Sequence, residues 1–202
     1  MKYLIYIVLA AVLWFVMFVL KPFNFWVMMA FSTSLLSVIS YLHYKDQFRK
    51  EYFNFNEIAI GIGSAALLYL IFFFGRYVLD TFGIIPDHAN NINSVYANKE
   101  QLPEWVVAML LFFPIGFGEE YFWRGYIQRH LAEKHGKWIA LIITVVFYTA
   151  VHIPTGNPIL LLASFLVGVY WGLIFIWRGN ILAAALSHML WDPFIFVIFP
   201  MN

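Results

Sequence analysis

Three ionisable side chains, Glu119, Glu120 and Arg124, closely follow a long apolar run that ends at Phe113. Ionisable groups within a membrane-spanning segment are energetically costly, so they are functional candidates by default. On a helix, Glu120 and Arg124 are four residues apart and can pair directly, whereas Glu119 points about 100° away from Glu120. The spacing therefore predicts one carboxylate held by arginine and a second one free to do chemistry. The alternative is a buried ion pair that only fixes helix packing.

Two histidines and an aspartate interrupt later apolar stretches. His152 ends an otherwise apolar segment, a position that is also typical of an interfacial or capping residue. His188 and Asp192 are one helical turn apart, so the carboxylate can accept a hydrogen bond from one ring nitrogen and orient the other. Metal-binding histidines usually have such a partner, although a polar contact between membrane helices has the same pattern.

Together these acids and imidazoles could hydrolyse an amide by either of two routes. Two neutral imidazoles and a carboxylate suit zinc with one coordination position open for water. A second glutamate could then carry the water's proton to the leaving amine. Alternatively, glutamate and histidine could activate water without a metal while another polar group stabilises the oxyanion. The residues by themselves leave both routes open.

Other hydrolytic sites match the sequence less well. There is no His-Glu-x-x-His, so the usual zinc-binding helix motif is absent. Ser164 and Ser187 do not lie in a recognisable nucleophile turn. A carboxylate dyad of Glu119 with Asp192, as in an aspartyl-type protease, is a further and weaker alternative.

The composition indicates what must hold these side chains in place. Of the 202 residues, 63% are hydrophobic and 11% are charged, against about 25% charged in a typical soluble domain. We therefore predict an integral membrane protein, in the cell membrane and surrounded by lipid. The net charge of +1 does not indicate a nucleic-acid partner. The absence of cysteine excludes disulfides, cysteine-bound zinc and thiol catalysis.

Seven apolar stretches approach the roughly 20 residues of helix that cross a bilayer. They are 3–20, 23–42, 58–79, a segment from 104 that contains both glutamates, 138–152, 159–177 and 181–199. We predict an all-α, polytopic transmembrane bundle that forms a single domain over residues 1–202. A half-span around 96–113 would raise the number of spans to eight. The polar segment 80–103 is expected to be an exposed loop with one short surface helix.

Helix-breaking residues stand beside the candidate site. Pro114, Gly116 and Gly118 are expected to kink or loosen the fourth span just before the glutamates. Pro193 is expected to bend the seventh span directly after Asp192. At about 1.5 Å per residue, distances along the helices allow the acids and histidines of three spans to reach a similar depth.

The charges of the links predict the orientation of the chain. The N-terminus and the links after spans two, four and six carry eight cations, Lys2, Lys45, Arg49, Lys50, Arg129, Lys134, Lys137 and Arg178, whereas the opposite side carries three, Lys21, Arg76 and Lys99. The positive-inside rule therefore places the N-terminus in the cytoplasm. With seven spans, the C-terminus lies outside. A cavity among spans four to seven is expected to open toward the cytoplasm or sideways into lipid.

The three polar groups resemble the motifs of a known family, the CAAX protease and bacteriocin-processing (CPBP, or Abi) family of intramembrane peptidases, which includes the Ras-converting CAAX endopeptidase. The matching motifs are Glu119-Glu120-x-x-x-Arg124, an aromatic-x-x-x-His that ends at His152, and His188-x-x-x-Asp192. The resemblance covers residues 104–195. The order and spacing of the three motifs together make it specific.

The resemblance implies a role for each residue. Glu119 would be the base that activates water, and Glu120 would support the site together with Arg124. His152 and His188 would bind a divalent metal, with zinc expected and Glu119 as a further ligand, or would stabilise the oxyanion. The family is generally classed as metal-dependent, and a metal-free glutamate mechanism is also argued for its members.

Two positions depart from the family pattern. Asp192, which would assist His188, stands where Asn is common, so the local charge differs. Tyr148 stands where the family usually has Phe, and an aromatic ring is kept.

We therefore predict an intramembrane metalloendopeptidase that hydrolyses a peptide bond of a membrane-associated or lipidated substrate. The alternative is a non-catalytic membrane immunity or scaffold protein of the same fold, in which the polar cluster serves packing only. A third option is a small ion carrier, because buried glutamate and histidine can also relay protons or metals. The sequence leaves open the substrate, its prenylation and the oligomeric state.

Overall fold

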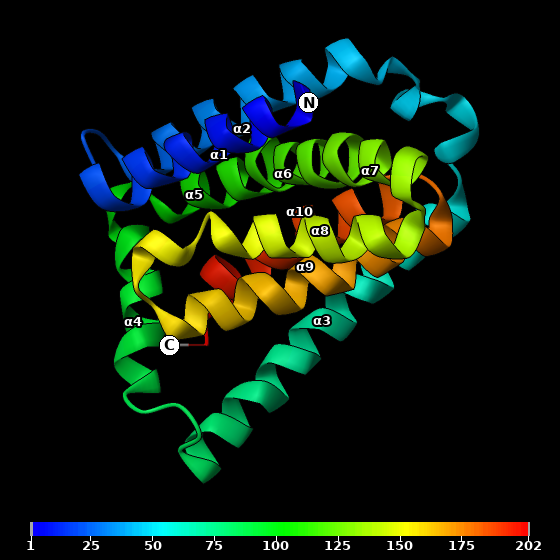
Figure 1. Ribbon diagram of the computed structural model, residues 1–202. Helices are drawn as coiled ribbons and strands as arrows, with labels where there is room; N and C mark the ends of the chain where they lie inside the picture. Colours follow the sequence, from blue (N-terminus) through cyan, green and yellow to red (C-terminus); the bar gives the residue numbers. More distant parts are fainter. Residues whose placement is uncertain (1, 202) are drawn as a thin grey trace.

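In the computed structural model, which describes residues 2–201, the chain folds into a helical bundle, and the described residues contain no strand (Figure 1). The elements are α1 (Lys2–Phe15), η1 (Val16–Leu20), α2 (Phe25–His43), η2 (Lys45–Phe48), η3 (Lys50–Tyr52), α3 (Phe55–Phe82), α4 (His88–Tyr96), η4 (Ala97–Gln101), α5 (Glu104–Leu110), η5 (Leu111–Gly116), α6 (Phe117–Phe122), η6 (Trp123–Gln128), α7 (Arg129–His135), α8 (Lys137–Ala150), η7 (Ile153–Thr155), α9 (Pro158–Arg178), α10 (Leu182–Pro193) and η8 (Phe194–Ile198). The η elements are short 3-10 or π-helical turns that extend or join the α-helices. The predicted all-α fold is confirmed.

Most of the predicted spans are helices long and apolar enough to cross a membrane. The six that qualify are Tyr3–Leu20, Phe25–His43, Phe55–Phe82, Glu104–His135, Lys137–Thr155 and Pro158–Arg178. The seventh predicted span forms the shorter apolar helix Leu182–Ile198. The chain is thus a polytopic helical membrane protein, with the candidate residues on its fourth, fifth and seventh apolar segments.

The fourth span is broken just before the glutamates. Phe113 has extended backbone angles, φ −154° and ψ 128°, inside an otherwise helical segment. The cause is Pro114, because a proline ring clashes with a helical conformation of the residue that precedes it. Helix resumes after the break, and α6 carries Glu119 and Glu120 in its first turn. The expected kink is therefore present, and it sets the direction in which both carboxylates leave the helix.

Two glycines let this span approach its neighbours closely. A Cβ at Gly118 would lie 2.9 Å from the carbonyl oxygen of Thr33 in α2, and one at Gly116 would lie 3.1 Å from Cα of Met189 in α10. Glycine permits such an approach because it has no side chain. The packing that results places Glu119 in the interior of the bundle.

Ion pairs join the links that carry most of the cations. Arg129 donates to both carboxylate oxygens of Asp46 at 2.8 Å, and Arg178 donates to Glu57 at 2.6 Å. The Arg129 guanidinium holds the pKa of Asp46 below its usual range. The links after spans two, four and six therefore meet at one end of the bundle, which we call the basic face.

The remaining links meet at the other end. Gln101 Oε1 accepts from the backbone amide of Phe25 at 2.8 Å, and Arg76 donates to the carbonyl oxygen of Met201 at 2.8 Å. These contacts join the first link, the long polar segment and the end of the chain. The two sets of contacts agree with spans that alternate in direction.

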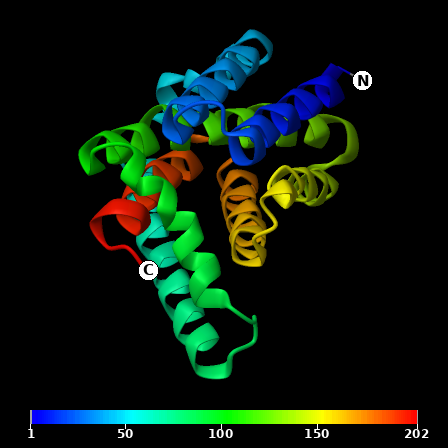
Figure 2. The same ribbon diagram turned by 90° about the vertical axis from the view of Figure 1, so that its left-hand side faces the viewer.

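The polar segment 80–103 contains the expected short helix, α4. Asn157, at the start of α9, donates to the carbonyl oxygen of Asn91 at 2.7 Å and to the hydroxyl of Ser94 at 2.9 Å. Figures 1 and 2 show α3 running away from α9, with α4 returning from the far end of α3. Side chains of α3 and α9 line a space between these helices, and side chains of α4 line it at that end.

Candidate active site

A cavity of about 650 Å³ occupies this space and reaches the polar motifs. Its lining is mostly apolar, with the largest contributions from α3 and α9, and it includes the polar residues Glu119, Tyr148, His152, His188 and Asp192. Four of the six predicted site residues thus share one cavity. Glu120 and Arg124 are not among its described lining residues.

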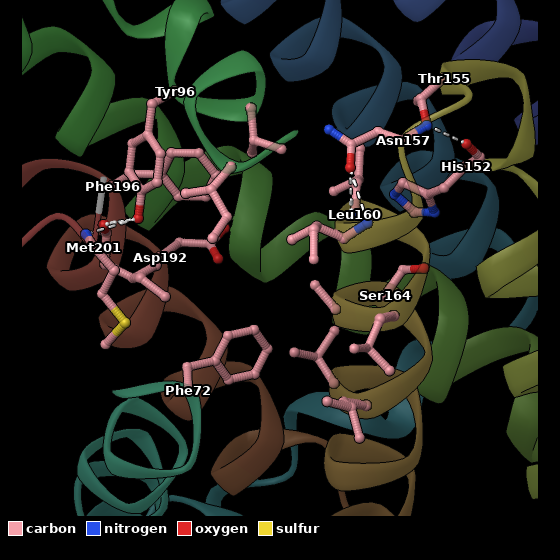
Figure 3. Close-up of a pocket in the computed structure, with 18 of the residues that line it drawn as sticks. Phe72, Tyr96, His152, Thr155, Asn157, Leu160, Ser164, Asp192, Phe196 and Met201 are labelled. Atoms are coloured by element: carbon pink, nitrogen blue, oxygen red, sulfur yellow. Dashed lines mark hydrogen bonds between the residues drawn. The ribbon is translucent and has the colours of Figure 1, made fainter. Parts of the chain in front are cut away.

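Figure 3 shows two walls of the cavity that face each other. His152 and Ser164 lie on one wall, formed by the end of the fifth span and by α9. Asp192 and Phe72 lie on the opposite wall, formed by α10 and α3. A substrate segment between the walls would meet polar groups from both sides.

Glu119 is the carboxylate that faces the cavity. Its side chain is buried, and its Oε2 accepts a hydrogen bond of 2.9 Å from the hydroxyl of Tyr148. Tyr148 lies in α8, on the neighbouring span. One carboxylate oxygen is therefore held in place by a residue of a different helix.

Glu120 points behind the cavity wall and is fully buried. Its Oε1 accepts from Arg124 Nη1 at 2.8 Å and lies 2.9 Å from Nδ1 of His188. Arg124 also donates to the carbonyl oxygen of Gly168 in α9 at 3.0 Å. The structure therefore gives the two adjacent glutamates the different surroundings that their spacing predicted.

His188 is fixed on several sides. Its ring stacks on Trp171 with centroids 3.7 Å apart and planes 15° apart. Its Nε2 lies 3.2 Å from Oδ2 of Asp192, while its Nδ1 faces Glu120. The contact between His188 and Asp192 is the one that their i, i+4 spacing predicted. Ring nitrogens that face carboxylate oxygens act as hydrogen-bond donors.

His152 is held by two groups that the sequence analysis did not identify. Its Nδ1 lies 2.8 Å from the backbone carbonyl oxygen of Tyr148, which makes that nitrogen the donor. Its Nε2 then accepts from the indole N–H of Trp14 at 3.3 Å. The helical spacing of Tyr148 and His152 could have suggested the first contact. Trp14 gave no signal, because it lies in the first span, 138 residues away.

The serine alternatives find no support in these contacts. The hydroxyl of Ser187 accepts from the indole N–H of Trp171 at 3.2 Å, and Ser187 is fully buried. The hydroxyl of Ser164 donates to the carbonyl oxygen of Leu161, although Ser164 lines the cavity. The contacts described for both hydroxyls are thus those of packed helix residues, without a histidine base.

The donor atoms do not fit the predicted metal in this arrangement. A metal requires an imidazole nitrogen with a free lone pair. Both nitrogens of His188 face carboxylates, and the acceptor nitrogen of His152 is used by Trp14. Within residues 2–201, no group of three His, Cys, Asp or Glu side chains is arranged to hold a metal ion. Zinc ligation by Glu119, His152 and His188 would require these contacts to change.

A comparison with protein families supports the motif assignment. Residues 101–194 match the family described as type II CAAX prenyl endopeptidase Rce1-like. The matched segment runs from just before α5 to Phe194 and contains all three motifs. Neither a curated protein nor a solved structure matches the chain. The predicted family resemblance is thereby confirmed for residues 101–194, nearly half of the chain, which are similar to the type II CAAX prenyl endopeptidase Rce1-like family.

Proposed function

We propose that the protein is an intramembrane endopeptidase that cleaves a membrane-associated substrate, with Glu119 as the base that activates water. The observation that carries the proposal is the different placement of two adjacent glutamates. Glu120 is paired with Arg124 away from the cavity, whereas Glu119 lines the same cavity as a histidine of each later motif. A carboxylate in that position is available to accept a proton from water.

The proposed reaction uses groups of the chain itself. Glu119 removes a proton from water, and the oxygen of that water attacks the scissile carbonyl carbon. The same carboxyl group then gives the proton to the leaving amine as the carbon–nitrogen bond breaks. To stabilise the oxyanion, His188 would have to turn its Nε2 N–H from Asp192 to that oxygen, whereas His152 has no N–H to turn, because its Nδ1 donates to the Tyr148 carbonyl oxygen and its Nε2 accepts from Trp14.

We also propose that the basic face lies in the cytoplasm, as the excess of cations on that face predicts. The described cavity lining includes Lys21, Arg76 and Asn157 of the opposite end, and none of residues 44–57, 129–137 or 178–180. In this orientation the cavity opens sideways into lipid and toward the non-cytoplasmic face. Entry of the substrate from the cytoplasm, one of the two expectations from the sequence, is the less favoured route.

The test is cleavage of membrane-associated peptides by the purified protein in liposomes. We expect Glu119→Gln to lower turnover by at least about 100-fold, the usual contribution of a positioned acid–base group. Glu104→Gln is the matched control, because Glu104 is an exposed glutamate of the same span that pairs with Lys99. We also expect activity to survive a divalent-metal chelator. Normal cleavage by Glu119→Gln would refute the assignment of the base.

The alternative is a non-catalytic scaffold or immunity protein of the same fold. The bonds from Arg124 to carbonyl oxygens of α9 favour it, since they are packing contacts. Replacing both His152 and His188 by alanine separates the two functions. The wild type of an enzyme should cleave the peptide and the double variant should not, even where it remains folded, whereas a scaffold should show no cleavage in either form and only a loss of stability.

A further inference from the structure

The side chain of Tyr148 is enclosed by aromatic and charged groups of the site. Its ring meets Trp123 edge-on with centroids 5.4 Å apart, and the centroid of the His152 ring lies 5.3 Å away. The guanidinium carbon of Arg124 lies 5.0 Å from the ring centroid. These contacts fix the ring plane and with it the position of the hydroxyl group.

The hydroxyl makes a single described contact, the 2.9 Å hydrogen bond to Oε2 of Glu119. The terminal torsion of a glutamate is broad, so an unheld carboxyl group can rotate. A hydrogen bond to a charged oxygen is stronger than one between neutral groups. Holding Oε2 therefore selects one orientation of the carboxylate and leaves Oε1 as the oxygen for water.

Tyr148 also connects the first two motifs through its backbone. Its carbonyl oxygen accepts from Nδ1 of His152 at 2.8 Å, while its hydroxyl donates to Glu119. A phenylalanine, which is usual at this position in the family, would keep the ring contacts and the carbonyl contact. Only the bond to Glu119 depends on the hydroxyl.

We propose that the hydroxyl of Tyr148 is a positioning group that orients Glu119 for water activation. This inference rests on the proposed function. The hydrogen bond from this hydroxyl to Glu119 is one that a phenylalanine at position 148 could not make. The three sequence motifs specify an aromatic ring at this position but not its hydroxyl group.

The test compares Tyr148→Phe with the wild type in the liposome cleavage assay. We expect kcat to fall about 10- to 100-fold, the range for loss of a hydrogen bond to a charged group. KM should stay within about twofold, because the hydroxyl acts on the base rather than on the substrate. Tyr170→Phe is the matched control, since it loses a 2.8 Å bond to the carbonyl oxygen of Ser64 and lies outside the cavity lining. Both variants should melt at similar temperatures.

A second variant distinguishes positioning from a general effect on the fold. Glu119→Asp shortens the side chain by one methylene and draws the carboxylate away from Tyr148. If the hydroxyl acts through Glu119, Tyr148→Phe should change kcat far less in the Glu119→Asp background than in the wild type, because effects that share one contact are not additive.

Each outcome decides the inference. An unchanged kcat in Tyr148→Phe, with Glu119→Gln inactive, would refute the positioning role and leave the proposed function standing. A raised KM at constant kcat would assign the hydroxyl to substrate binding and also refute it. Equal cleavage by the wild type and Glu119→Gln would overturn the proposed function, and this inference with it.

Discussion

Glu119 and Glu120 are adjacent in the sequence, and the same substitution at each should affect stability very differently. Glu120→Gln removes the negative charge that faces Arg124 and His188, while keeping the size of the side chain. Glu120 is 0% exposed and Arg124 is 1% exposed, so solvent cannot replace the lost partner. The guanidinium would then face a neutral amide in place of a carboxylate, beside its bonds to the carbonyl oxygens of α9.

The size of the effect follows from these contacts. Removing one member of a buried ion pair costs about 3–5 kcal/mol. Because Glu120 Oε2 and Arg124 Nε are buried without a described hydrogen-bond partner, the pair is held by one bond, and we expect a cost of about 3 kcal/mol. Glu119→Gln keeps a carbonyl oxygen that can accept from Tyr148, so it should cost about 1 kcal/mol.

Thermal unfolding of the purified variants in one detergent measures the difference. For a chain of this length, these costs correspond to a loss of about 10 °C in melting temperature for Glu120→Gln and about 3 °C for Glu119→Gln. Arg124→Met is the second single variant of the comparison and removes the other member of the ion pair. Since the double variant Glu120→Gln/Arg124→Met leaves neither charge unpaired within this couple, it should lose less stability than the sum of the two single variants.

Two results would refute this reasoning. Equal melting temperatures for the two glutamine variants would mean that the Glu120 pair does not stabilise the fold more than the Glu119 contact does. Additive losses in the double variant would mean that Glu120 and Arg124 act independently, in conflict with their 2.8 Å contact.

Two further predictions concern packing and orientation. Gly118→Ala should lower the free energy of unfolding by about 1–3 kcal/mol, because its Cβ would meet the backbone of α2. Gly63→Ala is the control, since a Cβ at Gly63 would have nothing within 4 Å and should have little effect in the same melting assay. Equal losses of stability in the two variants would contradict the close approach of Gly118 to α2. Because the chain contains no cysteine, single-cysteine variants report sidedness cleanly in intact cells. A membrane-impermeant thiol reagent added outside the cells should label Glu100→Cys and the cavity variant Ser164→Cys. It should label Lys134→Cys only after lysis. If Ser164→Cys, like Lys134→Cys, is labelled only after lysis, the proposed opening of the cavity is refuted.

Local spacing alone determined several features correctly. The apolar stretches predicted the helical segments, because a helix that crosses lipid needs a long run of apolar residues. The contacts of Glu120 with Arg124 and of His188 with Asp192 followed from the i, i+4 rule, which depends only on regular helix geometry. The break before the glutamates followed from Pro114, whose effect on the preceding residue is also local.

The tertiary structure decided what these local rules could not reach. The contacts of Tyr148 with Glu119, of Trp14 with His152 and of Glu120 with His188 each join different spans. They depend on how the helices are rotated and tilted against one another. No rule relates sequence spacing to contact for residues of different helices. The sequence could therefore suggest a shared site without assigning its hydrogen bonds.

The same limit applies to the metal and to the opening of the cavity. The sequence supplied imidazoles and carboxylates in suitable numbers, but only the fold shows that the ring nitrogens of His152 and His188 are already used by neighbouring groups. Composition and link charges determined a membrane bundle with one basic face. The divergence of α3 from α9 decided at which end of the bundle the cavity lies. The sequence could not reveal this, because the direction of each helix is set by packing against its neighbours rather than by its own residues.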